Sequence, residues 1–331
     1  MKSVSLKYLV NLSGKIRIRL DKEYLKKLLT KASNNNCPQS DMEFVRKIGL
    51  KPTTKYLNTT IVGWIKRGGS LGADKLEKIR EMAGIDWEEL QKKVVSVKFG
   101  YSAREARISF PIRVNRELGS IIGHILGDGS IDSKYRQISF SNSEKVLLKE
   151  FSDNMQKIFC LEPRMWMQEN PDFGNTQWDK RIENIDDLLV GRNCSLFYPT
   201  VCGVLLNLLF DDFAVGKEKR ITNNLLLADR EFKIGLIRAF YDDEGSVGDN
   251  NIRLYQDRKE ILGIFKKLLE EFGITSSGIK TYYKRERERY YFDIFRKSNL
   301  KKFEKEIGLT SPKKIIKLRA ILNKRPHWND K

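Results

Sequence analysis

Two stretches of the chain, residues 118–131 and 234–247, share one pattern of apolar and small positions. Each is apolar enough for a buried helix, closes on an acidic residue and Gly, and continues with Ser and a β-branched residue. Small residues recur at every fourth position, which places them on one helix face. Because a smooth face lets helix backbones approach closely, we expect the two helices to pack against each other. The residues expected in this interface are Gly119, Gly123, Gly127, Gly235 and Ala239.

The sequence that follows each of these helices predicts strands and further helices in the same order. Residues 136–143 and 251–256 alternate between apolar and polar side chains, as a strand with one buried face does. We therefore predict an α+β fold of two pseudo-symmetric repeats, residues 116–232 and 233–331, each ordered αββαββα. Residues 171–178 are too loop-like to assign. The remaining strands are expected near 164–168, 187–194, 278–284 and 290–296, and the remaining helices at 144–158, 200–213, 258–272, 299–307 and 312–322.

The N-terminal part of the chain lacks this pattern. We expect a small α-helical domain over residues 1–95, similar to a helix-turn-helix DNA-binding domain, with Lys66 and Arg67 exposed toward a DNA groove. A generic helical cap with a solvated basic face is the alternative. Residues 96–115 indicate a linker with some strand character. Short apolar runs separated by Asn, Gly and Pro-Thr predict the helices of this domain at 25–32, 41–48, 60–66 and 73–83.

Two acids, Asp128 and Glu244, are predicted in the last turn of the paired helices, and Gly129 and Gly245 just beyond them are natural left-handed helix stops. A helix C-terminus carries partial negative charge, so a carboxylate there is disfavoured by up to about 1 kcal/mol. Two such carboxylates brought together also repel each other. A divalent cation between them is the simplest remedy. We therefore expect a metal site, the alternative being two helices that end in these residues by chance.

Composition narrows the chemistry. Lys and Arg number 62 against 43 Asp and Glu, a net charge of +19, which favours a polyanion such as nucleic acid as the partner. No apolar run approaches the roughly 20 residues of a membrane span, and the N-terminus lacks a signal-like apolar block. Four cysteines without CxxC spacing indicate a reducing, cytoplasmic compartment. The chain has two histidines, and His124 is expected to pack or hydrogen-bond within its helix, which leaves carboxylates and Mg²⁺ as the catalytic groups.

The two motif helices resemble a known family. Residues 121–129 (IIGHILGDG) and 237–245 (IRAFYDDEG) are similar to the paired motifs of the LAGLIDADG homing endonucleases, in the single-chain, two-motif form found in inteins and archaeal introns. The resemblance implies that Asp128 and Glu244 bind the metal ions, Mg²⁺ or Mn²⁺, and take part in catalysis.

The resemblance also implies that one lysine from each repeat reaches the active site. These are Lys219, in the segment Gly-Lys-Glu-Lys-Arg-Ile before the second motif, and Lys314, with Lys313 as the near alternative. An ammonium there can polarise the attacking water or stabilise the charge on a phosphate. A surface lysine in a basic loop is the alternative for Lys219.

A saddle-shaped sheet that binds double-stranded DNA is the third implication of the resemblance. The polar faces of the predicted strands carry Lys, Arg and Tyr, which suit contacts to phosphates and to major-groove edges. A plain solvated sheet face is the alternative. The side chains expected to contact DNA, besides those of the N-terminal domain, are Gln137, Ser139, Arg253, Tyr255, Lys280, Tyr282, Lys284 and Arg287.

These features together predict a site-specific, Mg²⁺-dependent DNA endonuclease that makes a double-strand break and acts as a monomer with an internal pseudo-dimer. No His-Asn pair for splicing is evident, so we expect a free-standing protein. Arg238 and Asp243 stand where the family has small or apolar residues, and Asp243 would lie beside Gly127, where it would loosen the helix pair or add a third acid. The alternatives are a non-cleaving transcriptional regulator on the same scaffold and an RNA-splicing maturase.

Overall fold

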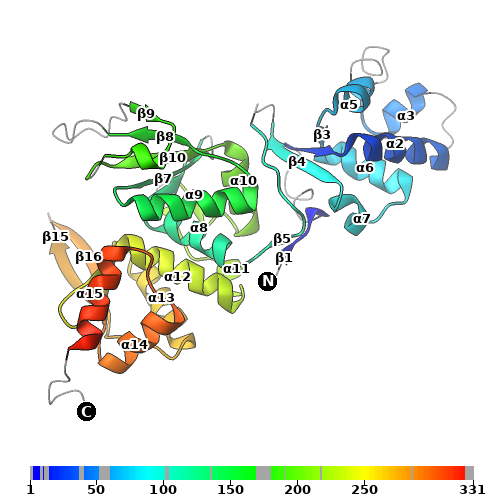
Figure 1. Cartoon of the computed structure of the whole chain (residues 1–331). Coiled ribbons are helices and arrows are strands. Elements are labelled where there is room, and N and C mark those ends of the chain that lie inside the picture. The colour runs from blue at the N-terminus through cyan, green and yellow to red at the C-terminus, as the bar shows by residue number, and fades with distance from the viewer. Residues whose placement is uncertain are drawn as a thin grey trace.

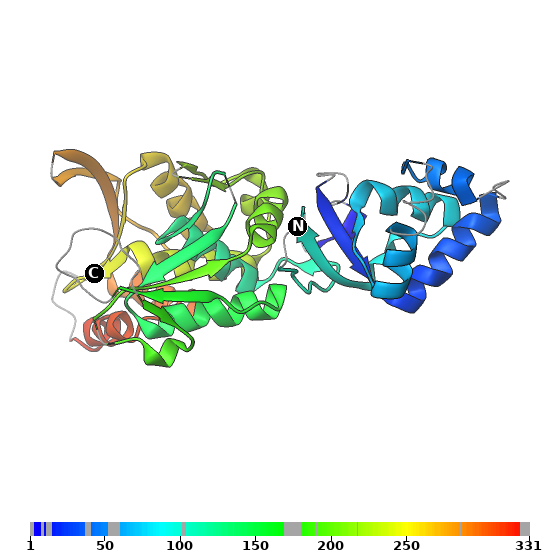
Figure 2. The ribbon, with the colours of Figure 1, turned by 90° about the horizontal axis from the view of Figure 1, so that it is seen from above.

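The computed structural model describes most of the chain, in an N-terminal domain and two repeats (Figure 1). Both views place the N-terminal domain to one side of the paired repeats (Figures 1 and 2). No helix in the described residues is long and apolar enough to cross a lipid bilayer. The described residues are 3–7, 10, 15–36, 41–51, 60–100, 104–134, 136–168, 180–189, 191–216, 218–284 and 286–324.

The N-terminal domain contains a sheet as well as helices, so the expectation of a purely α-helical domain is wrong. Its antiparallel strands lie in the order β3-β2-β4, with β2 at Ile16–Leu20, β3 at Leu71–Gly72 and β4 at Val94–Phe99. The cause is visible in β2, whose sequence IRIRL alternates: its apolar side chains are buried and its arginines are partly exposed. The helices packed with this sheet are α2 (Lys22–Asn36), α3 (Asp41–Lys47), α5 (Val62–Arg67), α6 (Ala73–Ala83) and α7 (Trp87–Gln91).

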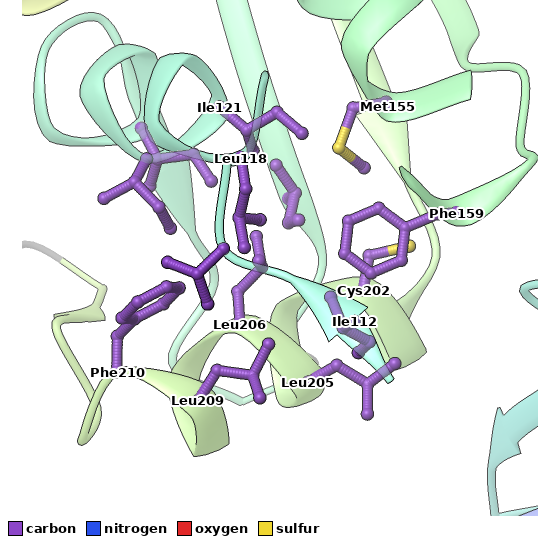
Figure 3. Packing of buried hydrophobic residues seen from close by; sticks show 14 of the residues in the cluster. Ile112, Leu118, Ile121, Met155, Phe159, Cys202, Leu205, Leu206, Leu209 and Phe210 are labelled. Atoms are coloured by element: carbon purple, nitrogen blue, oxygen red, sulfur yellow. The ribbon is translucent and has the colours of Figure 1, made fainter. Parts of the chain in front are cut away.

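The segment expected as a linker with some strand character, 96–115, contains strand residues and packs against the first repeat. Its first residues belong to β4, and β5 (Ile112–Arg113) pairs with β1 (Ser3–Val4). The Arg107 amide donates to the carbonyl of Phe159, 3.0 Å away, at the end of a helix of the first repeat. Figure 3 shows Ile112 in one apolar cluster with side chains of that repeat. Its apolar side chains explain this packing, since Ile108, Phe110, Ile112 and Val114 are all buried.

The first repeat follows the predicted order, but its main sheet has five strands rather than the expected four, and a short hairpin and a further helix follow that sheet. Its antiparallel sheet has the order β6-β7-β10-β8-β9. The strand expected at 187–194 lies instead at Cys194–Tyr198, because Ile185–Asp187 forms a 3-10 turn after Asn184 caps it. The unassigned stretch 171–178 lies outside the described residues. The elements are α8 (Arg116–Leu126), β6 (Gly129–Ile131), β7 (Ile138–Asn142), α9 (Lys145–Phe159), β8 (Arg164–Met167), β9 (Lys180–Ile182), β10 (Cys194–Tyr198), α10 (Thr200–Leu209), β11 (Ala214–Val215), β12 (Glu218–Lys219) and α11 (Asn223–Leu226).

The second repeat matches the first in its opening helix, strands and helix. Its four antiparallel strands have the order β13-β14-β16-β15. The buried faces of both sheets are covered by their own helices, so each repeat has its own layer of apolar side chains. The elements are α12 (Arg230–Glu244), β13 (Gly245–Val247), β14 (Ile252–Gln256), α13 (Lys259–Glu271), β15 (Lys280–Lys284), β16 (Arg287–Ile294), α14 (Lys297–Glu306) and α15 (Pro312–Asn323).

Helices α8 and α12 lie side by side where the repeats meet (Figure 1), and their backbones approach closely at the small residues. A methyl carbon added at Gly119 would stand 2.1 Å from the carbonyl oxygen of Phe232, and one added at Gly235 would stand 2.0 Å from that of Arg116. At Gly123 the added carbon would stand 2.8 Å from the methyl group of Ala239. Side chains larger than Gly or Ala therefore have no room along this stripe.

Candidate active site

The two acids Asp128 and Glu244 lie at matching ends of the helix pair. Helix α8 ends at Leu126, so Asp128 follows it by two residues, whereas Glu244 is the last residue of α12. Gly129 and Gly245 are not left-handed stops as expected, since neither has a positive φ, and each begins a strand. Glycine is needed there for space: an added methyl carbon at Gly245 would stand 2.4 Å from the carbonyl oxygen of Tyr241.

Burial and the charges of neighbouring acids raise the pKa of both carboxylates. Burial, followed by the charge of Asp243, raises the pKa of Asp128 to about 6. Burial, followed by the charge of Asp128, raises the pKa of Glu244 to about 7. One oxygen of Asp128 also accepts a hydrogen bond from the Asn142 amide at 3.1 Å. The arrangement therefore gathers negative charge from both repeats at the paired helix ends.

A lysine lies at the end of each motif helix. Lys219, carried by the short hairpin of β11 and β12, donates its ammonium protons to the carbonyls of Leu126 at 3.1 Å and Gly127 at 2.5 Å. Burial lowers the pKa of Lys219, and the charges of Glu244 and Asp128 oppose that shift. Lys219 therefore lies close to both acids, and its positive charge offsets the negative end of α8.

Lys314, on α15, does the same for α12. Its ammonium donates to the carbonyl of Tyr241 at 3.1 Å and to that of Asp242. Burial lowers its pKa, and the nearby Asp242 and Asp243 oppose that shift. Lys313 is exposed beside it. Between the two lysines left open by the sequence, the one at the site is Lys314.

The donor set fits a divalent metal ion that keeps part of its water. Among the described residues no group of three or more His, Cys, Asp or Glu is arranged to hold a metal by itself. Mg²⁺ is typically bound through one or two carboxylates, with waters and substrate phosphates as its other ligands. Asp128 and Glu244, with their raised pKa values and open side toward solvent, supply such a pair. Neighbouring carboxylates whose charges repel are the groups that a divalent cation would stabilise.

Asp243 does not join these two acids at the surface, because its side chain is completely buried. Its two oxygens lie 3.1 and 3.0 Å from Nδ1 of His124, which is also completely buried. Burial opposes the charged form of His124, but the charge and hydrogen bond of Asp243, together with the charges of Glu150 and Asp242, outweigh burial and raise the His124 pKa. The motif departure at Asp243 is thus matched by His124 on the facing helix, a pairing that the sequence analysis did not foresee.

The other departure, Arg238, joins α12 to α9. Its guanidinium lies 2.5 Å from a carboxylate oxygen of Glu150, and that oxygen also accepts from the Ser120 hydroxyl at 3.1 Å. Although burial alone would raise the Glu150 pKa, the charge of Arg238 together with the charge of His124 and hydrogen bonds from Thr310 and Ser120 outweighs burial, and the pKa is lowered. Arg238 therefore ties the second motif helix to the first repeat.

Asp242 holds the loop that carries Lys314, which sequence reasoning missed. Its oxygens accept from the amides of Thr310 at 2.8 Å and Ser311 at 3.0 Å, at the start of α15. The Ser311 hydroxyl in turn donates to Glu144 of the first repeat at 2.7 Å. The sequence signal for this contact was Ser311-Pro312, since proline is common at the first position of a helix. The free backbone amides at a helix start need an acceptor, and Asp242 provides it.

The polar side chains expected on the second sheet share one of its faces. In the register, Arg253 lies opposite Asp293 and Tyr255 opposite Tyr291, while Lys284 lies opposite Arg287. Directly opposed residues project to the same side of a sheet. Because strand positions two apart also share a face, one surface carries Arg253, Tyr255, Lys280, Tyr282, Lys284 and Arg287.

Aromatic rings and a guanidinium organise this face. The rings of Tyr255, Tyr282 and Tyr291 lie 5.7 to 6.1 Å apart. Arg253 lies 4.1 Å above the ring of Tyr291, and its Nε is 2.6 Å from an Asp293 oxygen. Lys280, Lys284 and Arg287 are exposed around this cluster.

The corresponding face of the first sheet carries serines and aromatic side chains together with two arginines, Arg164 and Arg181. Ser139 lies opposite Ser130 and Phe197, and its hydroxyl is 2.8 Å from that of Ser130. Gln137 is exposed just before β7. A surface hollow of about 480 Å³ is lined by Gly216 together with Ser130, Gln137, Ser139 and Phe197.

The two DNA contacts expected in the N-terminal domain lie apart from this site. Lys66 is exposed near the end of α5, in the N-terminal domain rather than in the repeats. The side chain of Arg67 lies outside the described residues.

Comparison with known proteins identifies part of this architecture directly. A family model described as a LAGLIDADG-like domain matches residues 231–308. The replication factor C small subunit of Methanocaldococcus jannaschii is 27% identical over 214 residues, which are 63% of this chain and 10% of that protein. The glutamine–fructose-6-phosphate aminotransferase of the same organism is 26% identical over 264 residues, 78% of this chain and 22% of that protein. The chain thus spans no more than about a fifth of these relatives.

Solved structures with a similar arrangement include homing endonucleases. A mesophilic variant of I-DmoI is 15% identical with a TM-score of 0.42, over 62% of this chain and 98% of that one. I-WcaI bound to its DNA recognition sequence is 15% identical with a TM-score of 0.41, over 61% and 85%. The N-terminal LAGLIDADG domain of DUF199/WhiA is 15% identical with a TM-score of 0.34, over 66% and 87%.

The matched domain begins with α12, and α8 opens the first repeat with the same succession of helix, strands and acid-bearing helix end. Each of these two helix ends carries an acid and contacts a lysine of the same repeat. Lys219 contacts the end of α8, and Lys314 contacts the end of α12. The chain therefore contains a LAGLIDADG-like domain over residues 231–308, and its first repeat resembles that domain in the order of its elements.

Proposed function

We propose that the chain is a site-specific DNA endonuclease that hydrolyses phosphodiester bonds with bound divalent metal ions, Mg²⁺ or Mn²⁺. One observation carries the proposal: Asp128 and Glu244, one from each repeat, lie at the paired helix ends, and burial and neighbouring acids raise the pKa of both. Two lysines accompany them. A purely structural protein gains nothing from this concentration of like charge, which costs stability unless a cation binds.

The residues of the chain would divide the work as follows. Asp128 and Glu244, once deprotonated, would hold the metal ions, which when bound activate water and stabilise the leaving oxygen. The ammonium groups of Lys219 and Lys314 are fixed by backbone carbonyls, so their charges occupy set positions near the scissile phosphates. Such fixed charges stabilise developing negative charge without reorganisation.

DNA would lie along the outer faces of the two sheets. The second sheet offers Lys280, Lys284 and Arg287 for phosphates and a tyrosine cluster with Arg253 for groove contacts. The two sheets differ in composition, so the duplex site would be asymmetric. Because both halves of the site come from one polypeptide, a monomer would suffice.

The named relatives support a self-contained activity. A replication factor subunit and an aminotransferase have unrelated named activities, yet each contains a segment similar to most of this chain and much larger parts that are not. A segment shared by proteins of such different function has a function of its own. DNA cleavage by this segment is consistent with that distribution.

The test is incubation of the full chain with a random double-stranded DNA library in Mg²⁺ and, in parallel, in Ca²⁺. We expect cleavage at a preferred sequence in Mg²⁺ and binding without cleavage in Ca²⁺. Asp128→Asn should abolish cleavage and leave binding in Ca²⁺ largely unchanged. Asp187→Asn, at an exposed acid in the 3-10 turn of the first repeat, is the matched control and should cleave normally.

The outcomes separate the competing functions. Sequence-specific binding without cleavage in either metal would indicate a transcriptional regulator. Preference for structured intron RNA over DNA would indicate a maturase. Full cleavage by Asp128→Asn would refute the metal role of that acid.

A further inference from the structure

One buried polar pair crosses the close-packed interface of α8 and α12. Nδ1 of His124 lies 3.1 and 3.0 Å from the two oxygens of Asp243, and both side chains are 0% exposed. Around this pair the interface consists of Gly119, Gly123 and Gly235 in backbone contact. Burial of two ionisable groups in such a place costs stability through desolvation.

The pair connects directly to the backbone of the two acids. His124 lies one helical turn before Asp128, and Asp243 immediately precedes Glu244. An Asp243 oxygen accepts a hydrogen bond from the Asp128 amide at 3.3 Å. The same carboxylate fills the space beside Gly127, where an added methyl carbon would stand 2.5 Å from its oxygen. The residue before Glu244 thus holds the amide of Asp128 across the interface.

The imidazole of His124 is itself fixed in place. Its ring packs against Phe140 at 4.7 Å and Phe151 at 5.9 Å between ring centres. Among the described residues its other nitrogen, Nε2, is buried without a hydrogen-bond partner. The ring is therefore held by packing on one side and by Asp243 on the other, and Asp243 is the only polar group that it contacts in the described part of the chain.

The pseudo-symmetric counterpart shows that packing alone does not require this pair. A shift of 116 residues, which relates Asp128 to Glu244, relates His124 to Phe240 and Asp243 to Gly127. Phe240 stacks on Phe265 with ring centres 4.1 Å apart. The other half of the interface therefore closes with an aromatic ring and a glycine, which leaves the His-Asp pair as an addition specific to one half.

We propose that His124 and Asp243 are positioning residues that set the distance and direction between the Asp128 and Glu244 carboxylates. The pair acts through the Asp128 amide and the end of α12, and it contacts neither DNA nor metal ion. This inference rests on the proposed function in so far as the two acids are metal ligands. Its geometric content, the restraint of the Asp128 amide by Asp243, is independent of that function.

The test compares the wild-type chain with Asp243→Ala and with the double variant His124→Phe/Asp243→Ala. The double variant removes both charges and copies the aromatic residue of the other half, so it should fold and melt at or above the wild-type temperature. Amide hydrogen exchange is measured first, without metal or DNA. We expect the Asp128 amide to exchange about tenfold or more faster in both variants. The Gly127 amide, bonded to the Gly123 carbonyl at 2.9 Å within α8, is the internal control and should change much less.

Mn²⁺ affinity and single-turnover cleavage are measured next on the same proteins. We expect the double variant to lose about 10- to 100-fold in Mn²⁺ affinity and rate, as changes to groups that orient ligands usually do, while DNA affinity in Ca²⁺ stays unchanged. A folded double variant with wild-type Mn²⁺ affinity, or with wild-type exchange at Asp128, would overturn the inference. If the wild-type chain neither binds Mn²⁺ nor cuts DNA, the proposed function fails, and the exchange of the Asp128 amide alone decides whether the pair restrains it.

Discussion

The closeness of the central helices predicts that a single methyl group can separate them. Gly119→Ala would place a carbon 2.1 Å from the Phe232 carbonyl oxygen and 3.1 Å from the Leu236 amide nitrogen, both backbone atoms that cannot rotate away. A Cβ atom essentially never lies closer than 3.0 Å to such a non-bonded atom, so the helices must part by about 0.9 Å. Gaps of about that size forfeit a quarter to a half of each dispersion contact they open.

The expected cost follows from two opposing terms. Insertion of a methyl group into a packed core typically costs about 1–3 kcal/mol, and rigid backbone neighbours put this case at the upper end. Alanine gains about 1 kcal/mol over glycine from helix propensity. We therefore expect Gly119→Ala to lower the free energy of unfolding by about 2 kcal/mol. It should also reduce cleavage, because separated helices displace the acids at their ends.

Gly263→Ala is the matched control. Gly263 lies in the interior of α13, and a methyl carbon added there meets no atom within 4 Å. Only the helix-propensity term remains, so this variant should be about 1 kcal/mol more stable than wild type. Urea unfolding followed by circular dichroism measures both. Equal stability of the two variants would show that α8 and α12 are not in backbone contact in solution.

The other predictions concern the site and the DNA-binding face. Since the pKa of Asp128 is raised to about 6 and that of Glu244 to about 7, Mn²⁺ affinity measured by titration should rise as pH increases through that range. Over the same range the metal-free protein should lose stability, since its folded state holds protons that the unfolded chain has already released; a constant melting temperature would contradict this. Lys219→Met should lower the cleavage rate by about 10²-fold with little change in DNA affinity in Ca²⁺, and an unchanged rate would remove that lysine from the mechanism. Lys284→Ala should reduce the slope of DNA affinity against salt by about one ion, whereas Lys301→Ala, on the exposed side of α14, should leave the slope unchanged.

The central helices and their acids could be predicted because their chemistry is local in sequence. Small residues four apart define a helix face whatever surrounds it, and Asp128 and Glu244 follow from the same two segments. The residues of the two helices themselves pointed to a metal ion for the positive charge between the helix ends, and Lys219 and Lys314 were expected there only through the family resemblance. In the structure Lys219 and Lys314 already supply part of it through the terminal carbonyls. Lys219 and Lys314 reach the helix ends through contacts between residues 93 and 73 apart in the sequence, respectively, which no local pattern encodes.

Other features were in the sequence but were outweighed by competing patterns. The alternation of Ile16–Leu20 is a strand signal, and it was missed because the helices that follow dominate the N-terminal segment. The turn at Ile185–Asp187 displaced a strand because Asn184 accepts from the Asp186 amide and starts a helical turn. The His124–Asp243 contact joins residues 119 apart, and only the facing of two helices in three dimensions brings them together.

The contact between His124 and Asp243 also bears on how this molecule is composed. A homodimer contains the same sequence in both subunits, so a histidine that faces an aspartate would occur on both sides of the two-fold axis. Such an interface would bury four ionisable groups, whereas this chain buries two. Joining the halves in one polypeptide lifts that restriction, because each half can then keep a partner that the other lacks. In a homodimer of the first half, His124 would therefore face Gly127. In a homodimer of the second half, Asp243 would face Phe240. Neither half is equipped to replace the other.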